Sequence, residues 1–203
     1  MQMNIANKLT VARMFLIPVF IILMYIINQY GNIDVLGASI RVFQFIDGLV
    51  FTIASITDYL DGYLARKHNL ITSFGEFFDP MADKLLVIAA FIMLVQANTV
   101  LGWVVVIIVS RELLVTGLRV LLATQSGKVM AAAWPGKIKT FTQMFAIIFY
   151  LFDDIGFALF NIPISTILIY VCLIFTVYSG AEYFYKGRHV FADTQEILKT
   201  NSF

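Results

Sequence analysis

The sequence predicts an all-α integral membrane protein, a six-transmembrane-helix bundle with a cytosol-facing polar cavity. Hydrophobic residues make up 60% of the 203 residues and charged residues 13%, whereas a soluble domain has about 45–50% and about 25%. The mean hydropathy is +0.86. The apolar residues also gather in runs close to the roughly 20 residues that cross a bilayer. This composition leaves no room for a separate soluble domain, so we expect residues 1–203 to form a single transmembrane domain.

Six apolar runs, joined by short connectors, are the predicted membrane helices. Pro18 lies inside the first run, where a membrane helix tolerates a kink. Pro80 follows Asp79 and is expected at the first helical position of the third helix. Because the connectors are short, consecutive helices should be antiparallel neighbours. The predicted helices cover residues 9–29, 44–65, 80–97, 99–122, 138–154 and 162–185.

The basic residues indicate how the bundle is oriented. If both chain ends lie in the cytosol, every Lys and Arg except Arg41 and Arg111 lies at the cytosolic ends of the helices. Such an asymmetry predicts the cytosolic side by the positive-inside rule. We therefore expect a multi-pass protein of a cell membrane, such as a bacterial cytoplasmic membrane, with both termini and the active site in the cytosol. We expect no nucleic-acid partner.

Four aspartates gather where the second predicted helix ends and the third begins. Asp58 and Asp61 are three residues apart and Asp79 and Asp83 are four apart, so each pair shares one helix face. In antiparallel neighbouring helices the two pairs can meet at one depth. An ionised aspartate at the bilayer centre costs roughly 2.5–3.5 kcal/mol, so the cluster needs compensating charge. Hard oxygen ligands favour Mg²⁺ or Mn²⁺, and two such ions would balance the carboxylates and clamp a pyrophosphate.

Small and basic residues surround the aspartates. Gly62 has no Cβ and would let a phosphate or a flat ring approach the backbone. Ala65 is small and lies on nearly the same face as Asp61. Arg66 offers a guanidinium fork for phosphate, and Gly75 is expected to open the turn or clear space. These residues favour the binding of a phosphate-containing substrate beside the metals.

A second polar cluster lies in the fourth and fifth predicted helices. Arg111 is deep in its span, where a solitary cation is costly. With Arg119, Lys137 and Lys139 it predicts a cationic pocket for an acceptor that carries its own phosphate. The alternative is that Arg111 pairs with a carboxylate such as Glu112 on another helix, and that the two lysines are interfacial anchors.

The aspartate motif resembles the signature of a known family. Asp58-x2-Asp61-Gly62-x2-Ala65-Arg66-x8-Gly75-x3-Asp79-x3-Asp83 is similar at every position to that of the CDP-alcohol phosphatidyltransferases. The resemblance implies a six-helix fold, two bound metal ions, a homodimer, and transfer of a phosphatidyl group from a CDP-lipid to an alcohol with release of CMP. It implies that one ion is held by Asp58, Asp61 and Asp79 and the other by Asp58, Asp79 and Asp83. Asp83 would also take the alcohol proton, and the CDP moiety would contact Gly62, Arg66 and Thr72.

Further segments resemble the phosphatidylglycerophosphate synthase branch of that family. They are Ser-Arg-Glu in the fourth helix and Gly136-Lys-x-Lys-Thr at the start of the fifth. The resemblance implies CDP-diacylglycerol as donor and sn-glycerol 3-phosphate as acceptor. Residues 4–13 are similar to the Pro-Asn-x-Leu-Thr-x2-Arg segment of those enzymes, with Ala6 where proline is usual. Asn7 and Thr10 are therefore expected near the nucleotide.

Other functions remain open at this point. Within the family the acceptor could be phosphatidylglycerol, serine or an inositol phosphate, as in a cardiolipin, phosphatidylserine or phosphatidylinositol phosphate synthase. An aspartate-rich prenyltransferase also uses Mg²⁺ and pyrophosphate, but its motifs are more widely separated. A divalent-cation channel or carrier would need carboxylates along a path through the bilayer. The outer half offers mainly Asp47, Asp153 and Asp154.

Overall fold

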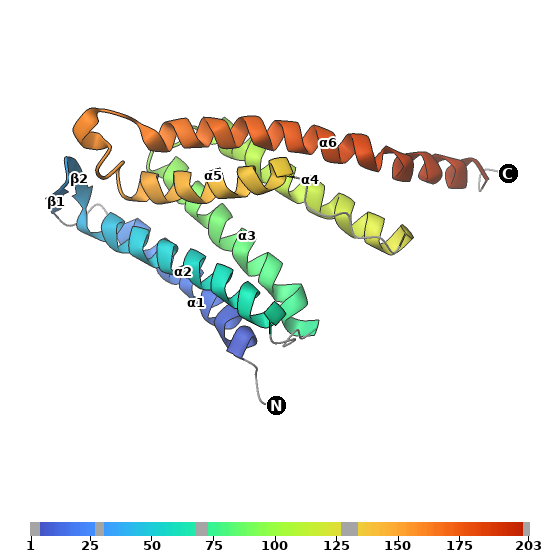
Figure 1. Cartoon of the computed structure of the whole chain (residues 1–203), viewed down its shortest axis with the longest axis horizontal. Helices are drawn as coiled ribbons and strands as arrows, with labels where there is room; N and C mark the ends of the chain where they lie inside the picture. The colour runs from blue at the N-terminus through green and yellow to red at the C-terminus, as the bar shows by residue number, and fades with distance from the viewer. Residues whose placement is uncertain (1–4, 27–30, 68–72, 127–133, 201–203) are drawn as a thin grey trace. The chain divides into compact units, whose positions relative to one another are not determined.

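Six long α-helices make up most of the part of the chain that the structure describes, which confirms the all-α, six-helix prediction. The computed structural model describes the backbone of residues 5–26, 31–67, 73–126 and 134–200, and side chains within 11–25, 31, 33–42, 44–57, 84–119 and 134–185. The elements are α1 (Ile5–Ile26), β1 (Asn32–Val35), β2 (Ala38–Arg41), α2 (Val42–Lys67), α3 (Ser73–Gln96), α4 (Gly102–Ser126), α5 (Trp134–Leu151), the short helix η2 (Ala158–Phe160) and α6 (Ile164–Thr200), as Figure 1 shows.

The predicted and observed helix boundaries differ at several places, and the difference at the start of α3 matters most for the site. The helix begins at Ser73, so Pro80 lies inside it and its prediction as the first helical residue is wrong. Ser73 and Glu76 have the S-x-x-E spacing of a capping box, which favours an earlier start. A proline inside the helix removes one backbone hydrogen bond, and membrane helices tolerate this loss. Gly75, expected to open the turn, is likewise inside α3.

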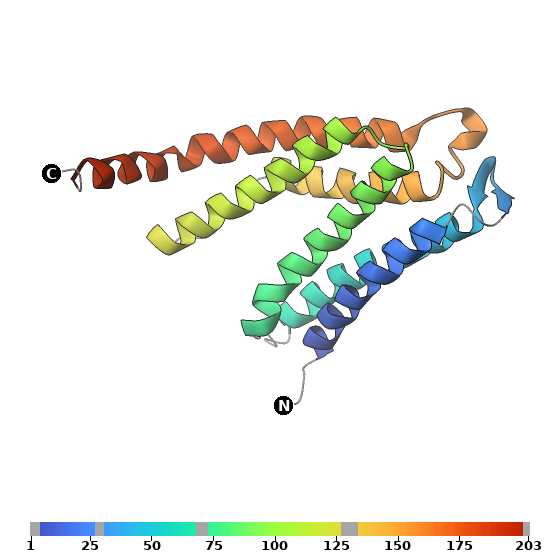
Figure 2. The same ribbon diagram turned by 180° about the vertical axis from the view of Figure 1, so that it is seen from behind.

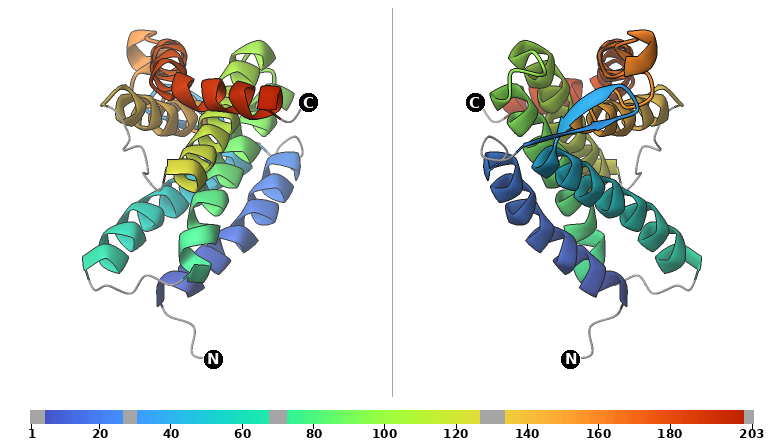
Figure 3. Two further views of the ribbon diagram at one scale, coloured as in Figure 1. Left: turned by 90° about the vertical axis from the view of Figure 1, so that its right-hand side faces the viewer. Right: turned by 90° about the vertical axis from the view of Figure 1, so that its left-hand side faces the viewer.

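A β-hairpin that the sequence analysis did not predict connects α1 to α2. Its strands are antiparallel, with Ile33 opposite Ile40, and Figure 3 shows them as two blue arrows. Leu36 and Gly37 form the turn with φ values of 47° and 83°, the left-handed pair of a tight hairpin turn. Ala38 and Ile40 are buried, so β2 packs one face inward.

The chain divides into two compact units, and α5 and α6 contribute to both. Unit 1 comprises residues 1–101 and 144–168, and unit 2 comprises residues 102–143 and 169–203. In unit 1, α1 contacts α2 and α3, and α1 lies beside α2 in Figures 1 and 2. Phe20, Phe51 and Phe91 are fully buried, and the Phe20 and Phe51 ring centroids are 6.2 Å apart. Large aromatic residues therefore contribute fully buried side chains to the unit 1 core.

The end of α5 and the segment that follows it are anchored to the rest of unit 1. The Gln44 Nε2 atom donates to the Tyr150 backbone oxygen at 3.2 Å, and the Phe45 and Phe152 rings meet edge to face at 5.4 Å. The Asp154 carboxylate accepts hydrogen bonds from the Ser165 backbone N–H and hydroxyl, both at 2.8 Å. Asp154 therefore satisfies a backbone donor at the start of α6, as an N-cap residue does.

Unit 2 has an unusually polar interior. Val115, Leu118 and Tyr183 form an apolar cluster between α4 and α6. Beside it, Thr176 and Ser179 of α6 are fully buried, and Lys139 of α5 is only 2% exposed. In a soluble domain such residues would rarely be buried. The polar interior of this unit is therefore a candidate functional region.

The apolar helices only partly meet the criteria for a membrane span. Within the described residues, Ile164–Tyr185 of α6 is the one helical segment both long and apolar enough to cross a membrane. Shorter apolar helices cover Val11–Tyr25, Gln44–Thr57 and Lys84–Gln96. The six helices are thus confirmed, while the expectation that each one spans a bilayer stays a prediction.

Candidate active site

The four aspartates all lie in helical backbone of unit 1. Asp58 and Asp61 belong to α2, and Asp79 and Asp83 belong to α3. Their side chains lie outside the described part of the chain. The last residue of α2 and the first of α3 lie at the same end of unit 1, as Figure 1 shows, and the two helices contact each other. The backbone thus places both pairs in the helical setting that the motif predicts, and the convergence of the four carboxylates stays a prediction.

The donor set at these helix ends fits divalent metal ions. Four carboxylates supply hard oxygen ligands, the kind that Mg²⁺ and Mn²⁺ prefer. Residues three or four apart in a helix share a face, so each helix presents two ligands together. The residues present therefore fit a pair of Mg²⁺ or Mn²⁺ ions.

Most residues predicted to contact the CDP-lipid lie in the same unit as the aspartates. They come from the three helices α1, α2 and α3. Asn7 and Thr10 lie in α1, and Gly75 lies in α3. Thr72 lies outside the described residues. α1 contacts both α2 and α3, so this predicted site is built within unit 1. The remaining members, in α2, are Gly62, Ala65 and Arg66.

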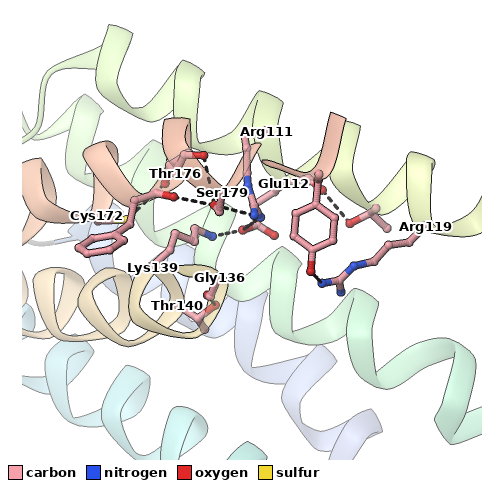
Figure 4. Close-up of polar contacts among 12 residues, drawn as sticks. Arg111, Glu112, Arg119, Gly136, Lys139, Thr140, Cys172, Thr176 and Ser179 are labelled. Atoms are coloured by element: carbon pink, nitrogen blue, oxygen red, sulfur yellow. Dashed lines mark hydrogen bonds and ion pairs between the residues drawn. The ribbon is translucent and has the colours of Figure 1, made fainter. Parts of the chain in front are cut away.

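Three of the predicted acceptor residues of unit 2 take part in polar contacts, and Figure 4 shows these contacts as two neighbouring sets. The Arg111 Nη2 atom donates to the Ser179 hydroxyl at 2.8 Å, and its Nη1 atom lies 3.6 Å from Glu112 Oε1. The Lys139 ammonium donates to the same Glu112 oxygen. Arg119 donates through Nη2 to the Tyr183 hydroxyl. Three of the four predicted cations thus belong to one region, between α4, α5 and α6.

Two buried arginine donors remain available in this network. Arg111 Nε and Arg119 Nε are buried and have no hydrogen-bond partner among the residues whose side chains the structure describes. Buried polar groups are normally hydrogen-bonded. A phosphate oxygen accepts charge-assisted hydrogen bonds from guanidinium groups. The orphaned donors therefore suit an anionic ligand.

Lys137, the fourth predicted cation, has a different environment. Its side chain is exposed, and its Nζ atom lies 5.3 Å from the centroid of the Trp134 ring. Trp134 is itself 76% exposed. An exposed lysine beside a tryptophan matches the interfacial anchor that was the open alternative. The carboxylate partner in that alternative, Glu112, instead bridges Lys139 of α5 and Arg111 of its own helix.

The sequence analysis missed Ser179 and Tyr183, which contact the two arginines. Both lie in a long apolar run of α6, four residues apart, so they share one helix face. That spacing was the one available signal. It became informative only when the structure placed this face against α4.

Comparison with known proteins adds independent support. A family model described as CDP-alcohol phosphatidyltransferase matches residues 3–178. The chain is 48% identical to a CDP-diacylglycerol–glycerol-3-phosphate 3-phosphatidyltransferase of Bacillus subtilis (strain 168), over 98% of this chain and 99% of the relative. Relatives of the same name are 41% identical in Rickettsia typhi (89% and 95% covered) and 35% identical in Haemophilus influenzae (90% and 92% covered). This chain belongs to the CDP-alcohol phosphatidyltransferase family.

Proposed function

We propose that this protein is a phosphatidylglycerophosphate synthase. It transfers the phosphatidyl group of CDP-diacylglycerol to sn-glycerol 3-phosphate, giving phosphatidylglycerophosphate and CMP. The near full-length 48% identity to the Bacillus subtilis enzyme supports this activity. The observation that carries the acceptor assignment is the network of Arg111, Arg119 and Lys139, with two buried guanidinium donors that have no partner among the described side chains.

The aspartates of α2 and α3 provide the reaction centre. Asp58, Asp61 and Asp79 would hold one divalent ion, and Asp58, Asp79 and Asp83 would hold the other. When bound there, Mg²⁺ or Mn²⁺ would supply Lewis-acid chemistry at the pyrophosphate and positive charge beside the departing CMP. Asp83 also accepts the proton of the acceptor hydroxyl as general base. The hydroxyl oxygen bonds to the lipid-side phosphorus, and the bond from that phosphorus to the CMP oxygen breaks.

The nucleotide and the acceptor are held by different groups. Arg66 binds a CDP phosphate through its guanidinium fork, beside Gly62, Ala65 and Gly75, while Asn7, Thr10 and Thr72 complete the CDP-lipid site. Arg111 and Arg119 bind the acceptor phosphate through their Nε donors, for which the described part of the chain offers no partner. Lys139 adds positive charge, and Lys137 contributes from the exposed start of α5.

The enzyme works in a cell membrane, with its active site and both termini in the cytosol. The basic residues at the predicted inner helix ends support this orientation. Residues 1–203 form one catalytic domain in this proposal, which is supported by a family match over residues 3–178 that includes parts of both compact units. The functional form is a homodimer, as the resemblance to the family implies.

Acceptor-dependent CMP release tests this function. Purified protein is incubated with CDP-diacylglycerol and Mg²⁺ or Mn²⁺, and glycerol 3-phosphate, phosphatidylglycerol, serine and inositol phosphate are offered in turn. Among the four acceptors, we expect only glycerol 3-phosphate to give CMP and a phosphatidyl product, which is phosphatidylglycerophosphate. We expect no turnover when EDTA is added and none from a folded Asp83→Asn variant. Equal CMP release with another acceptor would refute the acceptor assignment. Divalent-metal flux into liposomes without CMP release would instead support a carrier.

A further inference from the structure

One face of α6 holds the two arginines of the acceptor network. Ser179, Gly180 and Tyr183 lie on this face, all of them buried. Ser179 accepts a hydrogen bond from Arg111, and Tyr183 accepts one from Arg119. The two arginines therefore depend on two α6 residues that lie one helical turn apart.

The Tyr183 ring lies close to both guanidinium groups. Its ring packs with Val115 and Leu118 and is 2% exposed, and these two α4 residues lie between Arg111 and Arg119 in the sequence. The ring centroid is 5.6 Å from Arg111 Cζ and 4.9 Å from Arg119 Cζ. An aromatic ring at such distances attracts cations and so offsets the repulsion between them.

Ser179 and Gly180 constrain the Arg111 side chain, one through a hydrogen bond and the other through the space that it leaves. The Ser179 hydroxyl donates to the Phe175 backbone oxygen at 2.6 Å, which leaves its oxygen lone pairs to accept from Arg111. A Cβ atom on Gly180 would lie only 3.2 Å from Arg111 Cγ. The glycine therefore leaves the space through which the arginine side chain passes.

We propose that Tyr183 is a positioning residue of the acceptor site, an inference that rests on the proposed function. Its hydroxyl holds Arg119 through Nη2, and its ring lies within cation–π distance of both guanidinium groups, so that the Nε donor of each stays available for the acceptor phosphate. Arginine side chains have many rotamers, and a site whose rotamers are already ordered loses less entropy when the ligand binds. Tyr183 acts through the arginines and not through the reacting atoms.

Removal of the Tyr183 hydroxyl tests this role. Tyr183→Phe keeps the ring and its packing against Val115 and Leu118 but deletes the acceptor of the Arg119 hydrogen bond. We expect the apparent KM for glycerol 3-phosphate to rise about tenfold, the effect of losing a hydrogen bond to a charged group. The kcat and the apparent KM for CDP-diacylglycerol should stay within about twofold of the unmodified enzyme. Tyr178→Phe is the matched control, because Tyr178 lies in the same helix and is 61% exposed.

A double-mutant cycle separates positioning from direct contact. Arg119→Ala should itself raise the KM for glycerol 3-phosphate, and adding Tyr183→Phe to it should raise that KM no further. Additive effects would overturn the inference, because Tyr183 would then act independently of Arg119. An unchanged KM in Tyr183→Phe, or a loss of thermal stability with both KM values altered, would overturn it as well.

The same cycle distinguishes this inference from the proposed function. If Arg119→Ala raises the acceptor KM and Tyr183→Phe does not, the inference fails and the acceptor site stands. If Arg119→Ala leaves the acceptor KM unchanged, the acceptor site itself is wrong and the inference fails with it. A second cycle combines Ser179→Ala with Arg111→Ala. In the enzyme that keeps Arg111, Ser179→Thr should have an acceptor KM closer to that of the unmodified enzyme than Ser179→Ala, because threonine retains the hydroxyl. Additivity in that cycle would likewise contradict positioning by α6.

Discussion

At the scale of single residues, the buried lysine of unit 2 depends most clearly on its partner. Lys139 is 2% exposed and donates to the Glu112 carboxylate, whose side chain is 19% exposed. A buried cation loses its hydration, and a carboxylate compensates for that loss. Glu112 also lies near Arg111, so it balances charge in the network without occupying the Nε donors, which have no partner within the described side chains.

Replacement of Glu112 should therefore destabilise the protein. We expect Glu112→Gln to cost about 3 kcal/mol, or roughly 6–12 °C in the thermal midpoint for a chain of this size, measured in detergent. The double variant Glu112→Gln/Lys139→Met should recover much of the loss, because the buried ammonium that donates to the carboxylate is removed with it. Lys137→Ala is the control and should change the midpoint little, since Lys137 is exposed. A midpoint unchanged by Glu112→Gln would contradict the assigned role of the pair.

At the scale of secondary-structure elements, long apolar runs were predictable and local boundaries were not. All six helices were predicted from hydrophobic length. The predicted start of α3 is wrong because proline is favoured at a first helical position, which pointed to Pro80, whereas the helix begins at Ser73. The hairpin at 32–41 was missed because each strand has only four residues. Helix α6 extends to Thr200, beyond the apolar residues that defined its predicted end.

Within the candidate site, the residues of the local sequence motif could be predicted, and the residues that act through contacts between distant segments could not. The aspartate motif was readable because its ligands lie at set spacings within two consecutive helices. The roles of Ser179 and Tyr183 were not readable, because they depend on which face of α6 meets α4. That choice is made by packing between distant segments, such as the Tyr183 contact with Val115 and Leu118, and no local pattern records it.

The start of α6 offers a test at this scale. Asp154→Ala removes the acceptor of two hydrogen bonds from Ser165. We expect a loss of about 1 kcal/mol and faster amide hydrogen exchange in the first turn of α6, measured by mass spectrometry. Asp34→Ala is the control, because Asp34 is an exposed acid in β1. Unchanged exchange in the first turn would show that Asp154 does not cap the helix.

At the scale of the whole molecule, polar and apolar residues are distributed as in a membrane protein. Large apolar side chains are exposed on helices, among them Val106 at 62% and Ile174 at 65%, while Lys139 and Ser179 are buried. Exposed large apolar surface is costly in water and is covered by lipid in a bilayer. This distribution agrees with the 60% hydrophobic composition and with an enzyme whose donor substrate is a lipid.

The central claim is that the aspartates of α2 and α3 gather two divalent ions that make the CDP-lipid cleavable. Its most direct test is the Mn²⁺ stoichiometry of the purified protein with CDP-diacylglycerol, read from the electron paramagnetic resonance signal of free Mn²⁺ and compared with CMP release. We predict two bound ions per chain, with metal binding and turnover lost together in Asp58→Asn and in Asp79→Asn and both kept in the control Asp34→Asn. Full turnover without bound metal, or unchanged Mn²⁺ binding after all four aspartates are replaced by asparagine, would contradict the claim.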